Sequence, residues 1–340
     1  MAHLLITGVS GYIGGHVALQ ALQQGHTVRG TTRSASKSEE IRADLAAHLP
    51  AEAMERFSVV AADLLSPDGW DEATAGVDAV LHVASPFVTD MPKDEQELIR
   101  PARLGVKHVV EAAVRQGVER IVQTSSVVAV MYGHSPEKSR FSAQDWSDLS
   151  GPGINAYTKS KTLAEKDLWE LAERSPGLKV TCVNPGFVLG PLLGRDPGTS
   201  VGVIRRFMRG EFPGVPRISF TTVDVRDVAE LHLRVLEDAE TVGQRYLAVA
   251  NTLWLKQMAE AILEAYPAFS KKVKARELPG WMVRAVALFD ATVRSSLPEL
   301  GKFREADNSP AVALGWKPRS AQESVMDTAR SLAEKGLVSP

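Results

Sequence analysis

The sequence has little cysteine and no long hydrophobic run. Its single cysteine, Cys182, excludes an intrachain disulfide framework and makes the reducing cytoplasm the expected compartment. No Cys/His cluster has zinc spacing, so no metal site is expected. No apolar run approaches the ~18 residues of a membrane-spanning helix. The short run His3–Ile6 is interrupted by Thr7 and Gly8, so it is interpreted as a strand and not as a secretory signal.

An excess of one charge is also missing. The 340 residues contain 39 Lys and Arg against 41 Asp and Glu, which gives a net charge of -2. This balance argues against a nucleic-acid backbone or an anionic membrane surface as the partner. The chain has no repeat or low-complexity tract, and at roughly 150 residues per domain its length predicts about two domains.

The first half of the chain alternates short apolar runs with segments of helical periodicity. The expected strands are His3–Thr7, Thr27–Thr32, Phe57–Ala61, Ala79–Ala84, Arg120–Thr124 and Leu178–Asn184. The expected helices run to about Gln24 and over Glu39–Leu49, Trp70–Ala75, Glu95–Arg115 and Asn155–Glu173. Strands separated by helices form βαβ units, and right-handed crossovers then favour a doubly wound parallel sheet, the Rossmann type of α/β fold.

The pattern loosens after about residue 186, where Pro and Gly cluster. Helices are expected over Val201–Arg209, Val225–Asp238 and Lys256–Tyr266, and strands over Arg217–Val223 and Arg245–Ala248. No Gly/Ser-rich linker separates the two parts. We therefore expect a dinucleotide-binding domain over 1–186 and about 217–250. A smaller, mainly helical substrate cap over about 187–216 and 251–340 is interleaved with it.

A glycine-rich turn follows the first expected strand and opens the first helix. It reads Gly8, Val9, Ser10, Gly11, Tyr12, Ile13, Gly14. Glycine is needed where backbone must approach a pyrophosphate closely, and a helix N-terminus offers free N–H groups to phosphates. The position of this G-x-x-G-x-x-G motif between strand and helix predicts a dinucleotide site.

The end of the second strand indicates which dinucleotide binds. An NAD site usually has a carboxylate there, but none occurs before Glu39. Arg33 and Lys37 stand where the 2′-phosphate of NADP(H) would lie. Asp63 and Leu64 follow the third strand and are candidates for the adenine, with a turn or helix-capping role for Asp63 as the alternative.

A second constellation suggests proton transfer. Tyr157 and Lys161 are four residues apart in an expected helix and so share one face. A neighbouring ammonium lowers the pKa of a phenol, which suits Tyr157 to protonate an alkoxide. Thr124, Ser125 and Ser126 end the fifth strand, where a hydroxyl can orient a carbonyl oxygen. Pro185, which ends the sixth strand, would present a rigid apolar surface to a nicotinamide.

Together these motifs resemble the extended short-chain dehydrogenase/reductases of the NAD-dependent epimerase/dehydratase superfamily, and within them the dihydroflavonol 4-reductase and cinnamoyl-CoA reductase-like group. The residues that carry the resemblance are Thr7–Gly14, Arg33, Asp63-Leu64, His82–Phe87, Thr124–Ser126, Tyr157–Lys161, Asn184–Gly186, Thr222–Ala229 and Leu314–Arg319. The resemblance spans nearly the whole chain. It implies an NADPH-dependent reductase that converts an aldehyde or ketone reversibly to an alcohol, as a monomer or homodimer.

The resemblance also implies roles for individual residues. The catalytic set is Ser126, Tyr157 and Lys161, with Ser125 as the fallback for the serine. The cofactor is lined by Val83, Ala84, Ser85 and Thr124, and the nicotinamide by Pro185 and Val188. Met131 and Thr221 stand where plant flavonoid reductases have polar residues that hold substrate hydroxyls. With Phe87, Tyr132 and Phe187 they predict an apolar pocket for an aryl or alkyl carbonyl compound.

Two other functions are compatible with the same scaffold. A nucleotide-sugar epimerase or dehydratase would hold NAD tightly, whereas Arg33 indicates NADPH. A dehydratase would also have an acidic pair after Thr124, where this chain has Ser125 and Ser126. A non-catalytic dinucleotide sensor would usually lack the Tyr157 and Lys161 pair.

Overall fold

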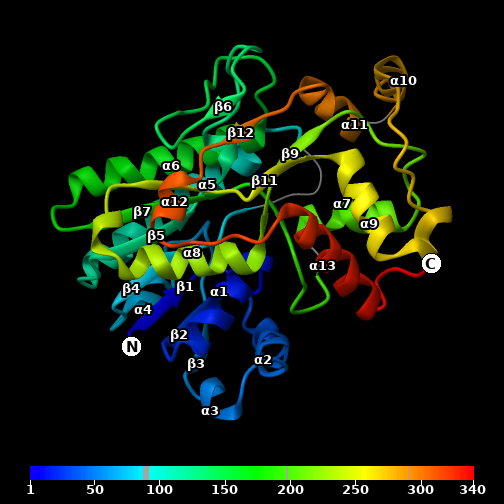
Figure 1. Cartoon of the computed structure of the whole chain (residues 1–340). Coiled ribbons are helices and arrows are strands. Elements are labelled where there is room, and N and C mark those ends of the chain that lie inside the picture. Colours follow the sequence, from blue (N-terminus) through cyan, green and yellow to red (C-terminus); the bar gives the residue numbers. More distant parts are fainter. Residues whose placement is uncertain (87–91, 197, 290) are drawn as a thin grey trace.

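The computed structural model describes residues 1–86, 92–196, 198–289 and 291–340. Its main layer is a seven-stranded sheet in the order β10-β7-β5-β4-β1-β2-β3, in which every neighbouring pair is parallel (Figure 1). The strands are β1 (His3–Ile6), β2 (Thr27–Thr32), β3 (Phe57–Ala61), β4 (Ala79–His82), β5 (Arg120–Thr124), β7 (Lys179–Pro185) and β10 (Arg245–Ala248). The predicted doubly wound parallel sheet is confirmed.

Helices cover both faces of this sheet. On one face lie α1 (Tyr12–Gln23) and α8 (Val225–Glu237), which pack against each other; on the other lie α4 (Trp70–Thr74), α5 (Gln96–Arg115) and α6 (Ala156–Arg174). Alternate residues of a strand point to opposite faces. Leu4 and Ile6 of β1 accordingly join the core under α1 and α8, while Leu5 between them joins the core under α5 and α6. Burial on both faces explains why these strands are apolar runs.

The chain changes direction across the sheet between β1 and β4. The order runs outward from β1 to β3 and then, from β4, outward on the other side to β10. Loops that follow β1 and β4 therefore diverge from a common point, which is where ligands bind in open α/β sheets. The turn after β1 and the segment after β4 meet there, since a Cβ on Gly8 would lie 3.0 Å from the Cα of Ala84.

A second core lies beyond the carboxyl ends of the strands. A three-stranded sheet of β8 (Phe187–Leu189), β9 (Ser219–Asp224) and β11 (Asn251–Trp254) packs with α7 (Gly198–Met208), α9 (Leu255–Ala265) and α13 (Ala321–Glu334). Figure 1 shows α13, in red, beside this sheet. The strand expected at Arg217–Val223 is β9, so it lies in the small sheet, whereas the strand at Arg245–Ala248 is β10 of the main sheet.

The remaining elements are short. β6 (Arg140–Phe141) and β12 (Glu305–Ala306) form a two-stranded sheet. The other helices are α2 (Ser38–Ala46), α3 (Ala51–Met54), α10 (Gly280–Val286), α11 (Ala291–Ser296) and α12 (Ser309–Ala313). Within the described ranges, no helix combines the length and apolar character needed to cross a bilayer, and no three His, Cys, Asp or Glu side chains gather as metal ligands.

Candidate active site

The glycine turn between β1 and α1 has the form that the sequence predicts. Gly8 has φ +70°, its N–H donates to Thr31 Oγ1 at 3.1 Å, and its carbonyl accepts from Gly11 N–H at 2.9 Å. Helix α1 begins at Tyr12, and Gly11 at its N-cap supplies no side-chain cap. The first N–H groups of the helix therefore remain available to an anion.

Gly14 is required by packing inside this turn. A Cβ at this position would lie 2.3 Å from Gly8 O and 2.9 Å from Gly8 C, and neither is an atom that can move without shifting backbone. Helix α1 thus approaches the turn closely. The spacing of Gly8, Gly11 and Gly14 is that of a phosphate-binding turn.

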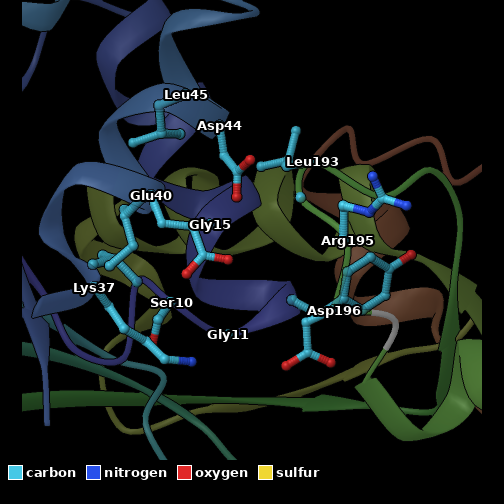
Figure 2. A pocket seen from close by; sticks show the side chains of 14 residues that line it. Ser10, Gly11, Gly15, Lys37, Glu40, Asp44, Leu45, Leu193, Arg195 and Asp196 are labelled. Atoms are coloured by element: carbon cyan, nitrogen blue, oxygen red, sulfur yellow. The ribbon is translucent and has the colours of Figure 1, made fainter. Parts of the chain in front are cut away.

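A cavity lies beside the N-terminal end of α1. Ser10, Gly11, Tyr12 and Gly15 line it from the turn and α1, and Lys37, Glu40, Ile41, Asp44 and Leu45 from the next segment. Figure 2 shows Lys37 on one side of the cavity and Arg195 and Asp196, which follow β8, on the other. Arg33 and Lys37 are exposed, and neither side chain bonds to another described residue. Both cations are therefore available to a ligand.

Asp63 and Leu64 lie in the turn after β3. The Asp63 carboxylate accepts from Leu65 N–H at 2.8 Å, while its carbonyl accepts from Trp70 Nε1 at 3.1 Å. Leu64 packs against Gly105 of α5, where a Cβ would approach Leu64 Cδ2 to 2.6 Å. Asp63 thus has the turn role that was its alternative interpretation, and a contact with adenine stays a prediction.

The segment after β4 is fixed to the glycine turn through Thr7. Thr7 Oγ1 accepts from Ala84 N–H at 2.9 Å and lies 3.0 Å from His82 Nδ1. Burial and the positive charge of Lys161 lower the pKa of His82 to about 3, so the ring is neutral. Val83, Ala84 and Ser85 follow as a half-buried strip beside the turn.

Ser126, Tyr157 and Lys161 come together beyond the carboxyl ends of the central strands. Ser126 follows β5 and is hydrogen-bonded to the Tyr157 hydroxyl. Its Oγ also lies 3.5 Å from the carbonyl of Pro185, at the end of β7. Tyr157 and Lys161 share a face of α6, and Lys161 is only 8 % exposed. The predicted trio therefore converges from two elements, the end of β5 and helix α6.

Burial shifts both titratable groups of this trio. Burial raises the pKa of Tyr157, and its hydrogen bond with Ser126 opposes the rise. Burial lowers the pKa of Lys161 to about 8, and the carboxylate of Glu165 opposes that fall. At neutral pH the phenol therefore holds its proton and the ammonium is charged, as a proton donor and its cationic neighbour require.

The other two hydroxyls at the end of β5 have different partners. The Ser125 hydroxyl donates to the buried carboxylate of Glu165. Thr124 Oγ1 lies 2.7 Å from Nε2 of His232, and Nδ1 of the same ring donates to Val228 O at 2.7 Å. Because a neutral ring that donates from Nδ1 accepts at Nε2, the threonine hydroxyl is the donor to His232. Of these hydroxyls, it is Ser126 that adjoins Tyr157. This geometry favours Ser126 over Ser125 as the catalytic serine.

The predicted nicotinamide residues lie on consecutive strands. Pro185 ends β7 beside Ala248 of β10, and Val188 lies in β8 beside Val223. Both are buried. Gly186 between the strands lies so near to Thr221 that a Cβ would be 2.2 Å from its carbonyl oxygen.

The predicted substrate residues have mixed surroundings. Tyr132 lies under Arg304, whose guanidinium is 4.7 Å from the ring centroid, and Phe187 stacks on Phe220 at 4.5 Å. Met131 is 2 % exposed and packs in a small core with Val127, Val130, Phe141, Leu247 and Val249. Thr221 is buried in β9, and Phe87 lies outside the described residues.

Sequence reasoning did not anticipate Arg304, His232 or Glu165. No sequence pattern points to Arg304 or His232, because they are far from the motifs along the chain and only the fold brings them to the site. A pattern does point to Glu165, since it lies four residues after Lys161 and eight after Tyr157, which is same-face spacing on a helix.

The chain is similar to several reductases over nearly its whole length. It is 30% identical to a cinnamoyl-CoA reductase of Medicago truncatula, across 97% of this chain and 95% of that one. It is 28% identical to the NADPH-dependent methylglyoxal reductase of Saccharomyces cerevisiae, across 97% of each. The crystal structure of yeast methylglyoxal/isovaleraldehyde reductase complexed with NADPH superposes with a TM-score of 0.82 at 27% identity, covering 99% of this chain and 100% of that one.

A family model matches the same region that contains the glycine turn, the Tyr157–Lys161 helix and the last strand of the main sheet. The match covers residues 4–248, which is most of the chain. The site geometry, the relatives and the fold lead to one assignment. The chain belongs to the NAD dependent epimerase/dehydratase family.

Proposed function

We propose that the protein is an NADPH-dependent oxidoreductase that reduces an aldehyde or ketone to an alcohol, reversibly. The observation that carries this proposal is the convergence of Ser126, Tyr157 and Lys161 beside the dinucleotide turn. The similar reductases named above support the choice of reaction, and the yeast methylglyoxal reductase among them, described as NADPH-dependent and crystallised with NADPH, supports the choice of coenzyme.

The residues present fit a dinucleotide. The turn has a positive φ at Gly8 and no room for a side chain at Gly14, and its helix N-terminus is uncapped by a side chain. Arg33 and Lys37 would hold the 2′-phosphate, and Val83, Ala84 and Ser85 would lie along the cofactor. NADPH, when bound, supplies the hydride for the reaction.

In the proposed reduction, the hydroxyls of Ser126 and Tyr157 hold the substrate's carbonyl oxygen as negative charge develops on it. Tyr157 then donates its phenolic proton to that oxygen. Lys161 carries a positive charge on the same face of α6 and stabilises the phenolate left behind. Pro185 lends a rigid apolar surface beside the reacting atoms, because it has no N–H to offer.

We also propose that the main sheet with its helices and the part built on the three-stranded sheet bind different molecules. Residues 1–186 with about 217–250 would bind NADPH, and about 187–216 with 251–340 would cover the substrate. The place of β10 in the main sheet and of α8 against α1 supports the first assignment. Tyr132 and Phe187 are half-buried and supply mainly apolar surface, which suits an aryl or alkyl carbonyl compound.

The direct test is a panel of aromatic and aliphatic aldehydes, ketones and diketones, followed by NADPH absorbance and repeated with NADH. We expect oxidation of NADPH with at least one apolar carbonyl compound. Protein that purifies with stoichiometric NAD and isomerises a nucleotide sugar would replace this proposal with the epimerase alternative. Binding of NADPH with no turnover across the panel would favour a sensor.

The coenzyme preference tests Arg33 and Lys37. Because a charge-assisted phosphate contact is worth about 1.5–3 kcal/mol, Arg33→Ala should raise KM for NADPH roughly tenfold or more and leave KM for NADH nearly unchanged. Lys37→Ala should act in the same direction. Lys107→Ala, on the exposed side of α5, serves as the control for loss of a surface charge. An equal effect on both coenzymes would contradict the 2′-phosphate assignment.

A further inference from the structure

The helix that carries Tyr157 and Lys161 also carries a buried carboxylate. Glu165 lies one turn after Lys161, and its side chain is 0 % exposed. A buried carboxylate is costly unless cations and hydrogen-bond donors surround it. Glu165 has such partners from three strand ends and from its own helix, and these connect it to the proposed site.

Two of these partners hold the segment that carries Ser126. The hydroxyl of Ser125 donates to Glu165 Oε2, and Asn184 Nδ2 donates to the same oxygen at 2.8 Å. Asn184 Nδ2 also donates to the carbonyl of Ser126 at 3.2 Å. Because Asn184 directly precedes Pro185, one carboxylate ties together the ends of β5 and β7 where the serine and the proline lie.

The third partner is an ion pair. Arg245, at the start of β10, donates from Nε to Glu165 Oε1 at 2.5 Å and is itself 9 % exposed. Its Nη1 donates to the carbonyls of Ala143 and Asp145 at 2.8 and 2.7 Å, and its guanidinium stacks 3.8 Å from the centroid of Trp146. Arg245 therefore holds Glu165 in one orientation.

We propose that Glu165 is a positioning residue of the reductase site: it clamps the strand ends that carry Ser126 and Pro185 and places a fixed negative charge behind Lys161. The inference rests on the proposed function, because it gives Glu165 the role of positioning the catalytic residues Ser126, Tyr157 and Lys161. The carboxylate opposes the fall in the pKa of Lys161 that burial causes, which keeps the ammonium beside Tyr157 charged at neutral pH.

The charged and titratable groups around Lys161 come from several elements. His82 of β4 and Glu165 of α6 act on Lys161, Cys182 of β7 and Arg245 of β10 surround Glu165, and Tyr132 lies near Tyr157. Burial lowers the pKa of His82 to about 3 and raises that of Cys182, so both are neutral near pH 7. Among these groups Glu165 is the one that favours the charged form of Lys161.

The test replaces both members of the Glu165–Arg245 ion pair, so that no unpaired charge is left buried. Glu165→Gln with Arg245→Met takes away both charges, and Glu165→Met with Arg245→Met is a second variant with apolar side chains, a type of exchange that proteins often tolerate. The matched control, Asp227→Asn with Arg319→Met, removes an ion pair whose carboxylate is equally buried but lies on α8. All variants are made in the full chain, and circular dichroism checks that each is folded.

The first readout does not need turnover. The NMR shift of the Lys161 ε-carbon, assigned by comparison with a Lys161→Met counterpart and recorded against pH, reports the ionisation of Lys161. Losing Glu165 should release the Lys161 proton at a pH lower by roughly one unit or more. The Asp227/Arg319 control should leave the Lys161 titration unchanged.

The second readout is the pH dependence of carbonyl reduction by NADPH. The alkaline fall of kcat should move to lower pH in the Glu165/Arg245 variants and stay in place in the control. At neutral pH, kcat should fall roughly tenfold or more with KM for NADPH unchanged, because the reacting groups are less well placed.

An unmoved Lys161 titration, the same effect in the control, or failure of both Glu165/Arg245 variants to fold would overturn the proposal. A wild-type protein that reduces no carbonyl compound would instead refute the proposed function. The titration would then still report whether Glu165 acts on the Tyr157 and Lys161 pair.

Discussion

At the scale of single residues, the decisive atom is the phenolic oxygen of Tyr157. It is hydrogen-bonded to Ser126 and lies on the helix face that carries Lys161. Tyr157→Phe removes the proposed proton donor without altering the packing of the ring, so turnover should fall roughly 10²-fold or more. Stopped-flow or steady-state NADPH oxidation measures the loss, and Tyr266→Phe, at the end of α9, serves as the hydroxyl control. Near-wild-type turnover in Tyr157→Phe would refute the proposed mechanism.

Gly14 allows a prediction about backbone geometry. A Cβ there would meet Gly8 O at 2.3 Å, whereas a Cβ on Gly202, in α7, would meet nothing within 4 Å. Gly14→Ala should therefore destabilise the fold by about 1–3 kcal/mol and weaken NADPH binding. Gly202→Ala should be neutral or slightly stabilising, because Ala is the better helix former. Thermal unfolding and NADPH fluorescence titration of both variants measure this, and equal behaviour would contradict the packing argument.

At the scale of elements, α6 is the part that presents the reacting groups, and its start is set by one side chain. Asn155 Oδ1 accepts from Thr158 N–H at 2.9 Å and from the Thr158 hydroxyl at 3.2 Å, which fixes the first turn where Tyr157 lies. Asn155→Ala should cost about 1 kcal/mol of stability and lower kcat, while Asn155→Asp should retain the cap. Chemical denaturation with parallel kinetics tests this. Undiminished stability in Asn155→Ala would show that packing alone fixes the turn.

The strands also show which parts of the fold can be predicted from the sequence. The six strands expected in the first half all occur within two residues of their predicted ends, because parallel strands buried on both faces read as apolar runs. Phe187–Leu189 and Asn251–Trp254 were missed as strands, since three or four residues between turns carry too little periodicity. The strand over 217–223 was found, but its membership in a second sheet depends on pairings that no local pattern encodes.

In the candidate site, too, some features can be predicted from the sequence and others depend on the fold. The glycine turn and the Tyr157 and Lys161 pair depend on local spacing, so the sequence predicts them directly. The choice between Ser125 and Ser126 depends on Glu165, Asn184 and Tyr157, which the fold brings from distant parts of the chain. The place of Arg304 over Tyr132 depends on the chain's return to the site after residue 300.

At the scale of the whole molecule, buried histidines couple stability to pH. Burial lowers the pKa of His16 to about 4, that of His82 to about 3 and that of His232 to about 4. In the unfolded chain each would titrate near 6.5, so the unfolded state binds more protons between about pH 6.5 and 4. The stability from these neutral rings is present above pH 6.5 and is lost as pH falls. Asp227, whose pKa burial raises to about 6, acts in the opposite direction.

Urea unfolding at pH 7.5, 6 and 5 measures this dependence. Each histidine should contribute a loss of up to about 1.4 kcal/mol per pH unit on acidification. His232→Gln should show a shallower dependence than the wild type. A free energy of unfolding that stays constant from pH 7.5 to 5 would contradict the burial of neutral histidines.

The last long helix, α13, has a consequence for how the chain folds as it is synthesised. Thr328 accepts from the N–H of Gly190 at 2.6 Å, and Ser331 accepts from the N–H of Leu192 at 2.9 Å. The second core is therefore completed by residues that leave the ribosome after the strands of the small sheet and helices α7 and α9. The strands of the seven-stranded sheet end with β10, although Ala311 and Trp316 later complete the core under α1 and α8. A nascent chain therefore passes through a stage in which α7, α9 and the small sheet expose apolar surface, and a chaperone would act at that stage.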